Sequence, residues 1–167
     1  HVPDRRTPWR NPPTAPPPGR AGKTTPPGTP AAPDRIYALV EAPGKKQGLY
    51  RSDDAGESWR QISDKKAIMS RPFYFTHIFA LPKGPDQRFV GNVRYWVSGD
   101  GGETFETKAV PHVDVHGLWI NPERPRLRIQ GNDGGATVSL NGGQTWSTQH
   151  NQPTAELYQV NVDERFP

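Results

Sequence analysis

One eight-residue motif occurs three times in the chain and constrains the fold more than any other feature. The copies are residues 52–59 (SDDAGESW), 98–105 (SGDGGETF) and 139–146 (SLNGGQTW). Their shared form is Ser-x-Asp/Asn-x-Gly-x-Ser/Thr-aromatic, and successive copies begin 46 and 41 residues apart. This regularity indicates a repeat protein in which each unit carries the motif once.

A second repeat runs in phase with the motif. Pro33, Pro85 and Pro125 each precede a short apolar run typical of a β-strand, and they lie 52 and 40 residues apart. No segment has the sustained periodicity of an amphipathic helix. A period of about 40–50 residues with several short strands per unit is typical of a β-propeller blade. We therefore predict an all-β fold, a β-propeller fragment of about three four-stranded antiparallel blades.

The predicted blade units cover residues 34–80, 81–120 and 121–159, and a further blade begins at 160–167. Residues 1–33 differ, because they hold 11 of the 20 prolines and a net charge of +4, which equals that of the whole chain. Such a sequence buries too little apolar surface to offset chain entropy, so we predict a disordered or polyproline-like tail. The alternatives for these residues are a linker, a peptide- or phosphate-binding tail, and a stretch outside the native reading frame.

The motif is predicted to form a tight turn between two strands. Its glycine supplies a backbone position with φ > 0, and its Asp or Asn accepts hydrogen bonds from backbone N–H groups two or three residues on. Asn replaces Asp in the third copy, an exchange that a turn tolerates but a catalytic acid or a charged metal ligand does not. The aromatic residue then packs against the blade. The twelve structural positions are Ser52, Asp54, Gly56, Trp59, Ser98, Asp100, Gly102, Phe105, Ser139, Asn141, Gly143 and Trp146.

These repeats resemble the Asp-box, or bacterial neuraminidase repeat, of sialidases, xyloglucanase-type hydrolases and the sortilin propeller. Residues 48–59, 116–125 and 131–160 are similar to bacterial sortilin-like propeller proteins, which often carry a glycosyl hydrolase label. The similarity covers about residues 30–167. It implies that the chain is a fragment of a longer circular propeller and that further blades of the parent chain are its partners. It also implies a location outside the cytoplasm, extracellular or periplasmic.

The strongest candidate site is the alternating run His112, Asp114 and His116. On a strand these side chains project from one face, near the mouth of the channel of a propeller. They fit a ligand contact, an acid/base pair or a divalent cation site, and equally a solvated strand entry with a hydrogen-bonded Asp–His pair. The sortilin-like relatives tend to have an Asp-His-His-Asp run here, which this chain keeps only in part, at Asp114 and His116.

Other candidates lie near the same predicted mouth. Asn132 and Asp133 stand between glycines, where a ligand has close access or where the chain simply makes a hairpin. His77 begins the equivalent strand one blade earlier, and a core-edge histidine is the alternative. Three aromatic residues are candidate sugar platforms or buried blade residues: Tyr74, Trp96 and Trp119.

Two functions follow as hypotheses. One is an exported, non-catalytic propeller that binds peptide or glycan ligands. The other is part of a glycoside hydrolase, for which Asp114 and Asp133 are weak catalytic candidates because no carboxylate pair matches a known motif. The residues after 33 carry no net charge, which argues against nucleic acid as a partner. No cofactor motif, cysteine or membrane-length apolar run is present.

Overall fold

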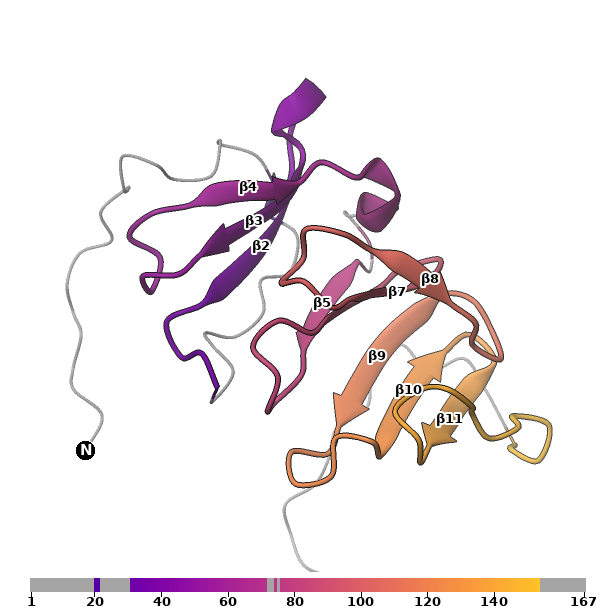
Figure 1. The fold of residues 1–167 in the computed structure, drawn as a ribbon. Helices are drawn as coiled ribbons and strands as arrows, with labels where there is room; N and C mark the ends of the chain where they lie inside the picture. The colour runs from indigo at the N-terminus through magenta and orange to yellow at the C-terminus, as the bar shows by residue number, and fades with distance from the viewer. Residues whose placement is uncertain (1–19, 22–30, 72–73, 75, 154–167) are drawn as a thin grey trace, which may run out of the picture.

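The computed structural model describes residues 20–21, 31–71, 74 and 76–153, and it confirms the all-β fold. Within these residues the chain forms three antiparallel sheets and two short 3₁₀ helices, and it contains no α-helix. The sheets follow one another along the chain and lie side by side in sequence order (Figure 1).

The three sheets share the arrangement of their first three strands, and the first two have a fourth strand as well. The first contains β1 (Arg20–Ala21), β2 (Ile36–Glu41), β3 (Gly48–Ser52) and β4 (Arg60–Ser63). The second contains β5 (His77–Ala80), β6 (Arg88–Gly91), β7 (Tyr95–Ser98) and β8 (Glu106–Lys108). The third contains β9 (Val115–Ile120), β10 (Arg128–Asn132) and β11 (Gly135–Ser139). The 3₁₀ helices η1 (Gly44–Lys46) and η2 (Lys66–Met69) lie in the loops after β2 and β4.

The hydrogen-bonded sheets and the sequence units group the first strand of each sheet differently. Strands β5 and β9 lie at the end of the units 34–80 and 81–120, but each pairs with the strand that follows it, β6 and β10. In the first sheet, β1 takes the equivalent edge and pairs with Val40 and Glu41 of β2. The remaining residues of the predicted tail, and the predicted blade start at 160–167, lie outside the described residues.

The apolar core lies mainly between neighbouring sheets. Between the first and second sheets, Tyr37 and Leu39 of β2 pack against Ile78 and Val90 of the second sheet. Between the second and third, Phe89 packs with Val115. Aromatic and branched residues on both faces of a sheet suit this arrangement, because the second sheet is covered on two sides.

Arginines reinforce each junction. The guanidinium of Arg88 lies over the Tyr37 ring of the preceding sheet, 4.3 Å from its centre, and that of Arg128 lies over Phe89 at 4.7 Å. Both arginines are the first residue of the second strand in their sheet. The same cation–aromatic contact therefore recurs between successive sheets.

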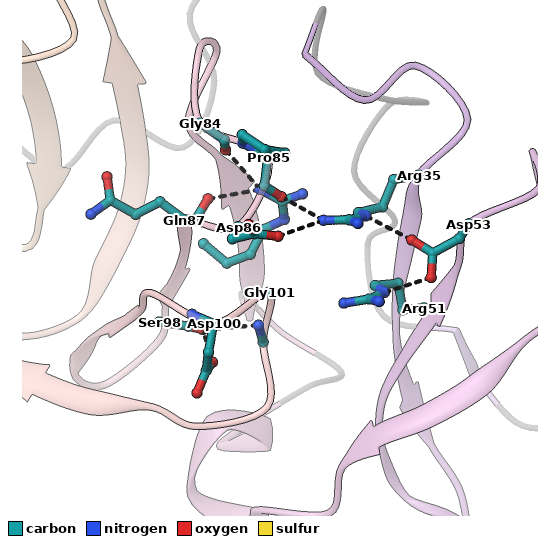
Figure 2. Close-up of polar contacts among 12 residues, drawn as sticks. Arg35, Arg51, Asp53, Gly84, Pro85, Asp86, Gln87, Ser98, Asp100 and Gly101 are labelled. Carbon is teal, nitrogen blue, oxygen red and sulfur yellow. Dashed lines mark hydrogen bonds and ion pairs between the residues drawn. The ribbon is translucent and has the colours of Figure 1, made fainter.

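A polar cluster joins the first two sheets at the edge of their interface (Figure 2). Arg35 donates from Nε to Asp53 Oδ1 at 2.7 Å, and from a terminal nitrogen to Asp86 Oδ1 at 2.7 Å and the Pro85 carbonyl at 2.9 Å. Arg51 donates to the other Asp53 oxygen at 2.9 Å. Partial burial acts to raise the pKa of Asp53, but the two arginines outweigh it and hold that pKa below its usual value.

Candidate functional site

The three copies of the motif form the same turn, as the sequence predicts. The serine hydroxyl accepts the glycine N–H in each copy, at 2.8 Å from Gly56, 2.9 Å from Gly102 and 2.8 Å from Gly143. These glycines have φ of 98°, 98° and 87°, a region that residues with a Cβ rarely adopt. In each copy, the N–H of the fourth motif residue also donates to a backbone carbonyl in the loop that precedes the second strand of the same sheet.

The Asp or Asn side chain of the motif accepts a hydrogen bond from the backbone N–H four residues further on, whereas the sequence predicted a bond from the N–H two or three residues on. The Ser58 N–H donates to Asp54 at 2.8 Å, and the Thr104 N–H donates to Asp100 at 3.0 Å. In the third copy the Thr145 N–H donates to Asn141 Oδ1 at 2.9 Å. The amide group of asparagine makes the same contact as the carboxylates, so the position is structural in all three copies.

Hydrogen bonding lowers the pKa of the two motif carboxylates, Asp54 and Asp100. The Ser58 hydroxyl, with Ser52 and the Ser58 N–H, lowers the pKa of Asp54 to about 2. Partial burial acts to raise the pKa of Asp100, but bonds from Thr104 and Ser98 outweigh it and lower that pKa to about 2. An acid that stays ionised to this extent is unsuited to donating a proton near neutral pH.

The motif turns and the candidate site residues lie at opposite ends of the strands. In the third sheet, Arg128 pairs with Ser139 at the motif end, and Asn132 pairs with Gly135 at the other end. Val115, where β9 begins, pairs with Asn132. The candidate ligand residues therefore gather at the end where β5 and β9 begin, away from the repeated turn.

The structure corrects the expected grouping of His112, Asp114 and His116. Strand β9 begins only at Val115, and Asp114 has a left-handed backbone with φ of 56°, which breaks the alternation of side chains. His112 Nδ1 contacts the Val113 carbonyl at 3.1 Å, and no group of three metal-ligating side chains is found within the described residues. The prediction that the three side chains share one strand face is wrong.

Instead, His116 pairs with Asp133. Its Nε2 lies 2.8 Å from Asp133 Oδ1, which links β9 to the hairpin between β10 and β11. Both side chains are about half exposed. The exposed Tyr74 ring lies roughly perpendicular to the His116 ring, with 6.4 Å between ring centres and 85° between planes. An imidazole, a carboxylate and an aromatic ring thus share one accessible surface.

The neighbouring candidates connect or support this pair. His77 Nδ1 lies 2.9 Å from the His116 carbonyl and so joins β5 to β9. The Asn132 side chain stabilises the hairpin, because its Oδ1 accepts the Gly134 N–H at 3.0 Å and the Gln149 amide at 2.7 Å. Of the aromatic candidates, Trp96 is buried in the core between the first two sheets, whereas Tyr74 and Trp119 are exposed.

Sequence reasoning missed Arg71, which faces the site from the loop after η2. A terminal nitrogen of Arg71 lies 3.7 Å from Asp114 Oδ1. Arg71 has φ of 52°, so both members of this ion pair have left-handed backbones, which are uncommon outside glycine. Nothing in the local sequence distinguishes Arg71 from other loop arginines, because the pairing depends on how the second and third sheets are placed.

No protein-family model matches the chain. Over 102 residues it is 29% identical to a vacuolar protein sorting/targeting protein 10 of Phaeosphaeria nodorum, an alignment that covers 58% of this chain and 6% of that protein. In structure it is similar to an ancestral GH74 enzyme, with a TM-score of 0.58 and 19% identity, over 77% of this chain and 18% of that one.

A GH74 enzyme of Niastella koreensis is similar as well, with a TM-score of 0.59 and 16% identity, over 80% of this chain and 22% of that one. The chain comprises β-propeller blades similar to those of sortilin-like proteins. It spans about a fifth of the solved chains and far less of the sequence relative. At this identity the solved structures show the fold alone. Within the described residues, no helix has the length and apolar character needed to span a membrane.

Proposed function

We propose that these blades belong to an exported, sortilin-like Asp-box propeller that binds a peptide or glycan ligand at the end where β5 and β9 begin. The observation that carries the proposal is the His116–Asp133 pair beside the exposed Tyr74, which offers a hydrogen-bonding pair and an aromatic ring on one exposed surface. Sugars and polar peptides are recognised by this combination of stacking and hydrogen bonding.

The candidate carboxylates support binding over hydrolysis. A glycosidase needs one carboxylic acid that donates a proton and a second carboxylate about 5–10 Å away. Asp133 is paired with His116, and Asp114 faces Arg71. Each carboxylate therefore already contacts a nitrogen of a neighbouring side chain, an arrangement that suits a fixed acceptor in a binding surface. The name of the sequence relative, a sorting and targeting protein, is also consistent with ligand binding.

The second candidate function is part of a glycoside hydrolase whose catalytic carboxylates lie partly outside this chain. It is favoured by the similarity in fold to GH74 enzymes and by two acids near one end of the third sheet, the half-exposed Asp133 and the more buried Asp114.

The test is a binding screen of the 167-residue chain against a glycan array and a peptide library, followed by titration calorimetry of the ligands found. We expect His116→Ala and Asp133→Asn to weaken binding by roughly tenfold or more, because each removes one partner of a contact to the ligand. The matched control is Asp54→Asn, the same chemical change at the opposite end of the strands, which leaves affinity unchanged.

Hydrolysis is assayed in parallel on xyloglucan and β-glucans. Turnover that is abolished by Asp114→Asn or Asp133→Asn would support the hydrolase and reject the pure binding function. Equal affinity of the wild-type chain and both site variants for every ligand would show that binding, if present, uses another surface.

A further inference from the structure

The two ends of the strands carry opposite charge. Nine loops connect β2 through β11, and they alternate between the two ends because the chain reverses direction at each loop. The five loops at the end where β5 and β9 begin hold six basic and three acidic side chains, and they are residues 42–47, 64–76, 92–94, 109–114 and 133–134. The four at the motif end hold three basic and seven acidic side chains, and they are residues 53–59, 81–87, 99–105 and 121–127. With histidine taken as neutral, the loops of the first end, the basic end, have a net charge of +3, and those of the motif end have −4.

Most basic side chains of the basic end are available to a ligand. Lys45, Lys46, Lys66 and Arg94 are exposed, and none of them forms an ion pair with another described residue. Lys65 instead donates to a backbone carbonyl of the second motif copy at 2.7 Å. Four cations therefore face solvent without an acidic neighbour to neutralise them.

Two of the three acids at this end already have nitrogen partners. Asp114 lies 3.7 Å from a terminal nitrogen of Arg71, and Asp133 lies 2.8 Å from His116 Nε2. Among the described residues, only Asp64 has no such partner. The charge that remains unpaired at the basic end is therefore mainly positive.

The loop that carries Lys45 and Lys46 is held in place by two side chains of the first sheet. Gln61 Nε2 donates to the carbonyls of Lys45 and Gln47, both at 2.9 Å. The Tyr50 hydroxyl donates to the Lys46 carbonyl at 2.8 Å. Three successive carbonyls of this loop are thus fixed from below, which reduces the entropy lost when its lysines contact a ligand.

The loops that carry Lys66 and Arg94 are joined to each other. The side-chain amide of Asn92 donates to the carbonyls of Ala67 and Ile68 at 3.2 and 3.1 Å, which links η2 to the hairpin between β6 and β7. Lys66 is the first residue of η2, and Arg94 lies in that hairpin. Since η2 also contacts β3, which follows the loop of Lys45 and Lys46, the four cations lie on neighbouring segments.

Exposed apolar side chains accompany these charges at the basic end. Val113 is 51% exposed and Tyr74 is 54% exposed. Val113 is aliphatic, so it offers apolar packing without the ring face on which a sugar stacks. A peptide with both acidic and apolar side chains complements such a surface in charge and in hydrophobicity.

We propose that the basic end binds an acidic peptide in which Asp or Glu residues are interspersed with apolar residues. The carboxylates of the peptide meet Lys45, Lys46, Lys66 and Arg94, and its apolar side chains pack beside Val113. The acidic motif end repels the same peptide, so the charge distribution also directs it to one end of the molecule. The proposal rests on the ligand-binding function proposed above, for which it names the class of ligand.

The test is fluorescence anisotropy with a labelled peptide of alternating Glu and Leu and with the same peptide carrying Gln in place of every Glu. We expect the 167-residue chain to bind the Glu peptide about tenfold or more tightly than the Gln peptide at about 20 mM salt. This preference should shrink at about 200 mM salt, because salt screens exposed charges. The triple variant Lys45→Gln/Lys46→Gln/Arg94→Gln should weaken binding of the Glu peptide by about tenfold.

The matched control removes the same number of charges from the opposite end. Lys83→Gln/Arg124→Gln/Arg126→Gln changes three exposed residues of the motif-end loops, so it has the same net charge as the first variant. We expect it to bind the Glu peptide as the wild-type chain does. Circular dichroism spectra that match the wild type show that both triple variants are folded.

Three results would overturn the proposal: equal affinity for the Glu and Gln peptides, equal loss of affinity in the two triple variants, or tighter binding of an oligogalacturonate than of the Glu peptide. If ligands from the array or library bind in a manner sensitive to His116→Ala while the Glu peptide does not bind, the acidic peptide is rejected and the ligand-binding function stands. If no ligand of any charge binds, both are rejected.

Discussion

The second and third sheets share the arrangement of their first three strands and the same motif turn, yet their outer faces differ sharply. Phe89, at the centre of the second sheet, is fully buried, whereas Ile129, at the equivalent position in the third, is 41% exposed. The difference is not one of side-chain polarity, since both residues are apolar. It reflects what covers each face: the third sheet lies on the second, and no described sheet lies on the third. Repeat proteins of this kind owe much of their stability to contacts between neighbouring units.

The largest expected effect comes from truncating these two side chains. Phe89→Ala removes a fully buried ring between two sheets and should destabilise the chain by about 3–5 kcal/mol. Ile129→Ala removes a partly exposed side chain and should cost under about 1 kcal/mol. Urea denaturation followed by circular dichroism gives both values from the shift in midpoint at constant slope.

Equal costs for the two substitutions would break the comparison, because they would mean that some surface covers Ile129 in solution as fully as the third sheet covers Phe89. If the slope of the urea transition changes only in Phe89→Ala, the second and third sheets unfold separately in that variant.

The sequence allowed the repeat to be predicted because its signals are local. Gly56 and Asp54 act within one turn, so the spacing of such residues was sufficient to place all three turns and the strands beside them. The first strand of each sheet was harder to assign. His77 begins a strand that lies close in sequence to the first sheet but pairs with the second, and only hydrogen bonding between strands decides this.

The candidate site was less predictable, because it depends on contacts between segments far apart in the chain. Asp114 was expected to alternate with its neighbours along a strand, but its left-handed backbone ends that alternation. The pairing of His116 with Asp133 joins two separately identified candidates, and their proximity follows from the register of β9 on β10. Arg71 has no local signal at all.

A smaller effect is expected from a single hydroxyl at the junction of the first two sheets. The Tyr37 hydroxyl donates to the buried Gly101 carbonyl at 2.9 Å, so Tyr37→Phe leaves that carbonyl without this donor at a cost of about 1 kcal/mol. The control is Tyr50→Phe. Its hydroxyl donates to the carbonyl of the exposed Lys46 in η1, within the loop between β2 and β3, and water can replace it there. A urea midpoint that falls more for Tyr50→Phe than for Tyr37→Phe would contradict the importance of the junction.

The smallest expected effect is a difference in the pH dependence of stability between the first two motif copies and the third. Asp54 and Asp100 have their pKa lowered from 3.8 to about 2 in the folded chain. A group with a lowered folded pKa stabilises the fold above its unfolded pKa, and that stabilisation is lost as the pH falls from about 4 to about 2. Asn141 does not titrate, so the third turn is insensitive in this range. The double variant Asp54→Asn/Asp100→Asn should therefore lose less melting temperature between pH 5 and pH 2 than the wild-type chain, as measured by circular dichroism. Asn141→Asp should lose more melting temperature over this range, because it places a third carboxylate in the same kind of hydrogen-bonded turn. Identical pH profiles for all three proteins would show that these turns do not contribute to acid stability.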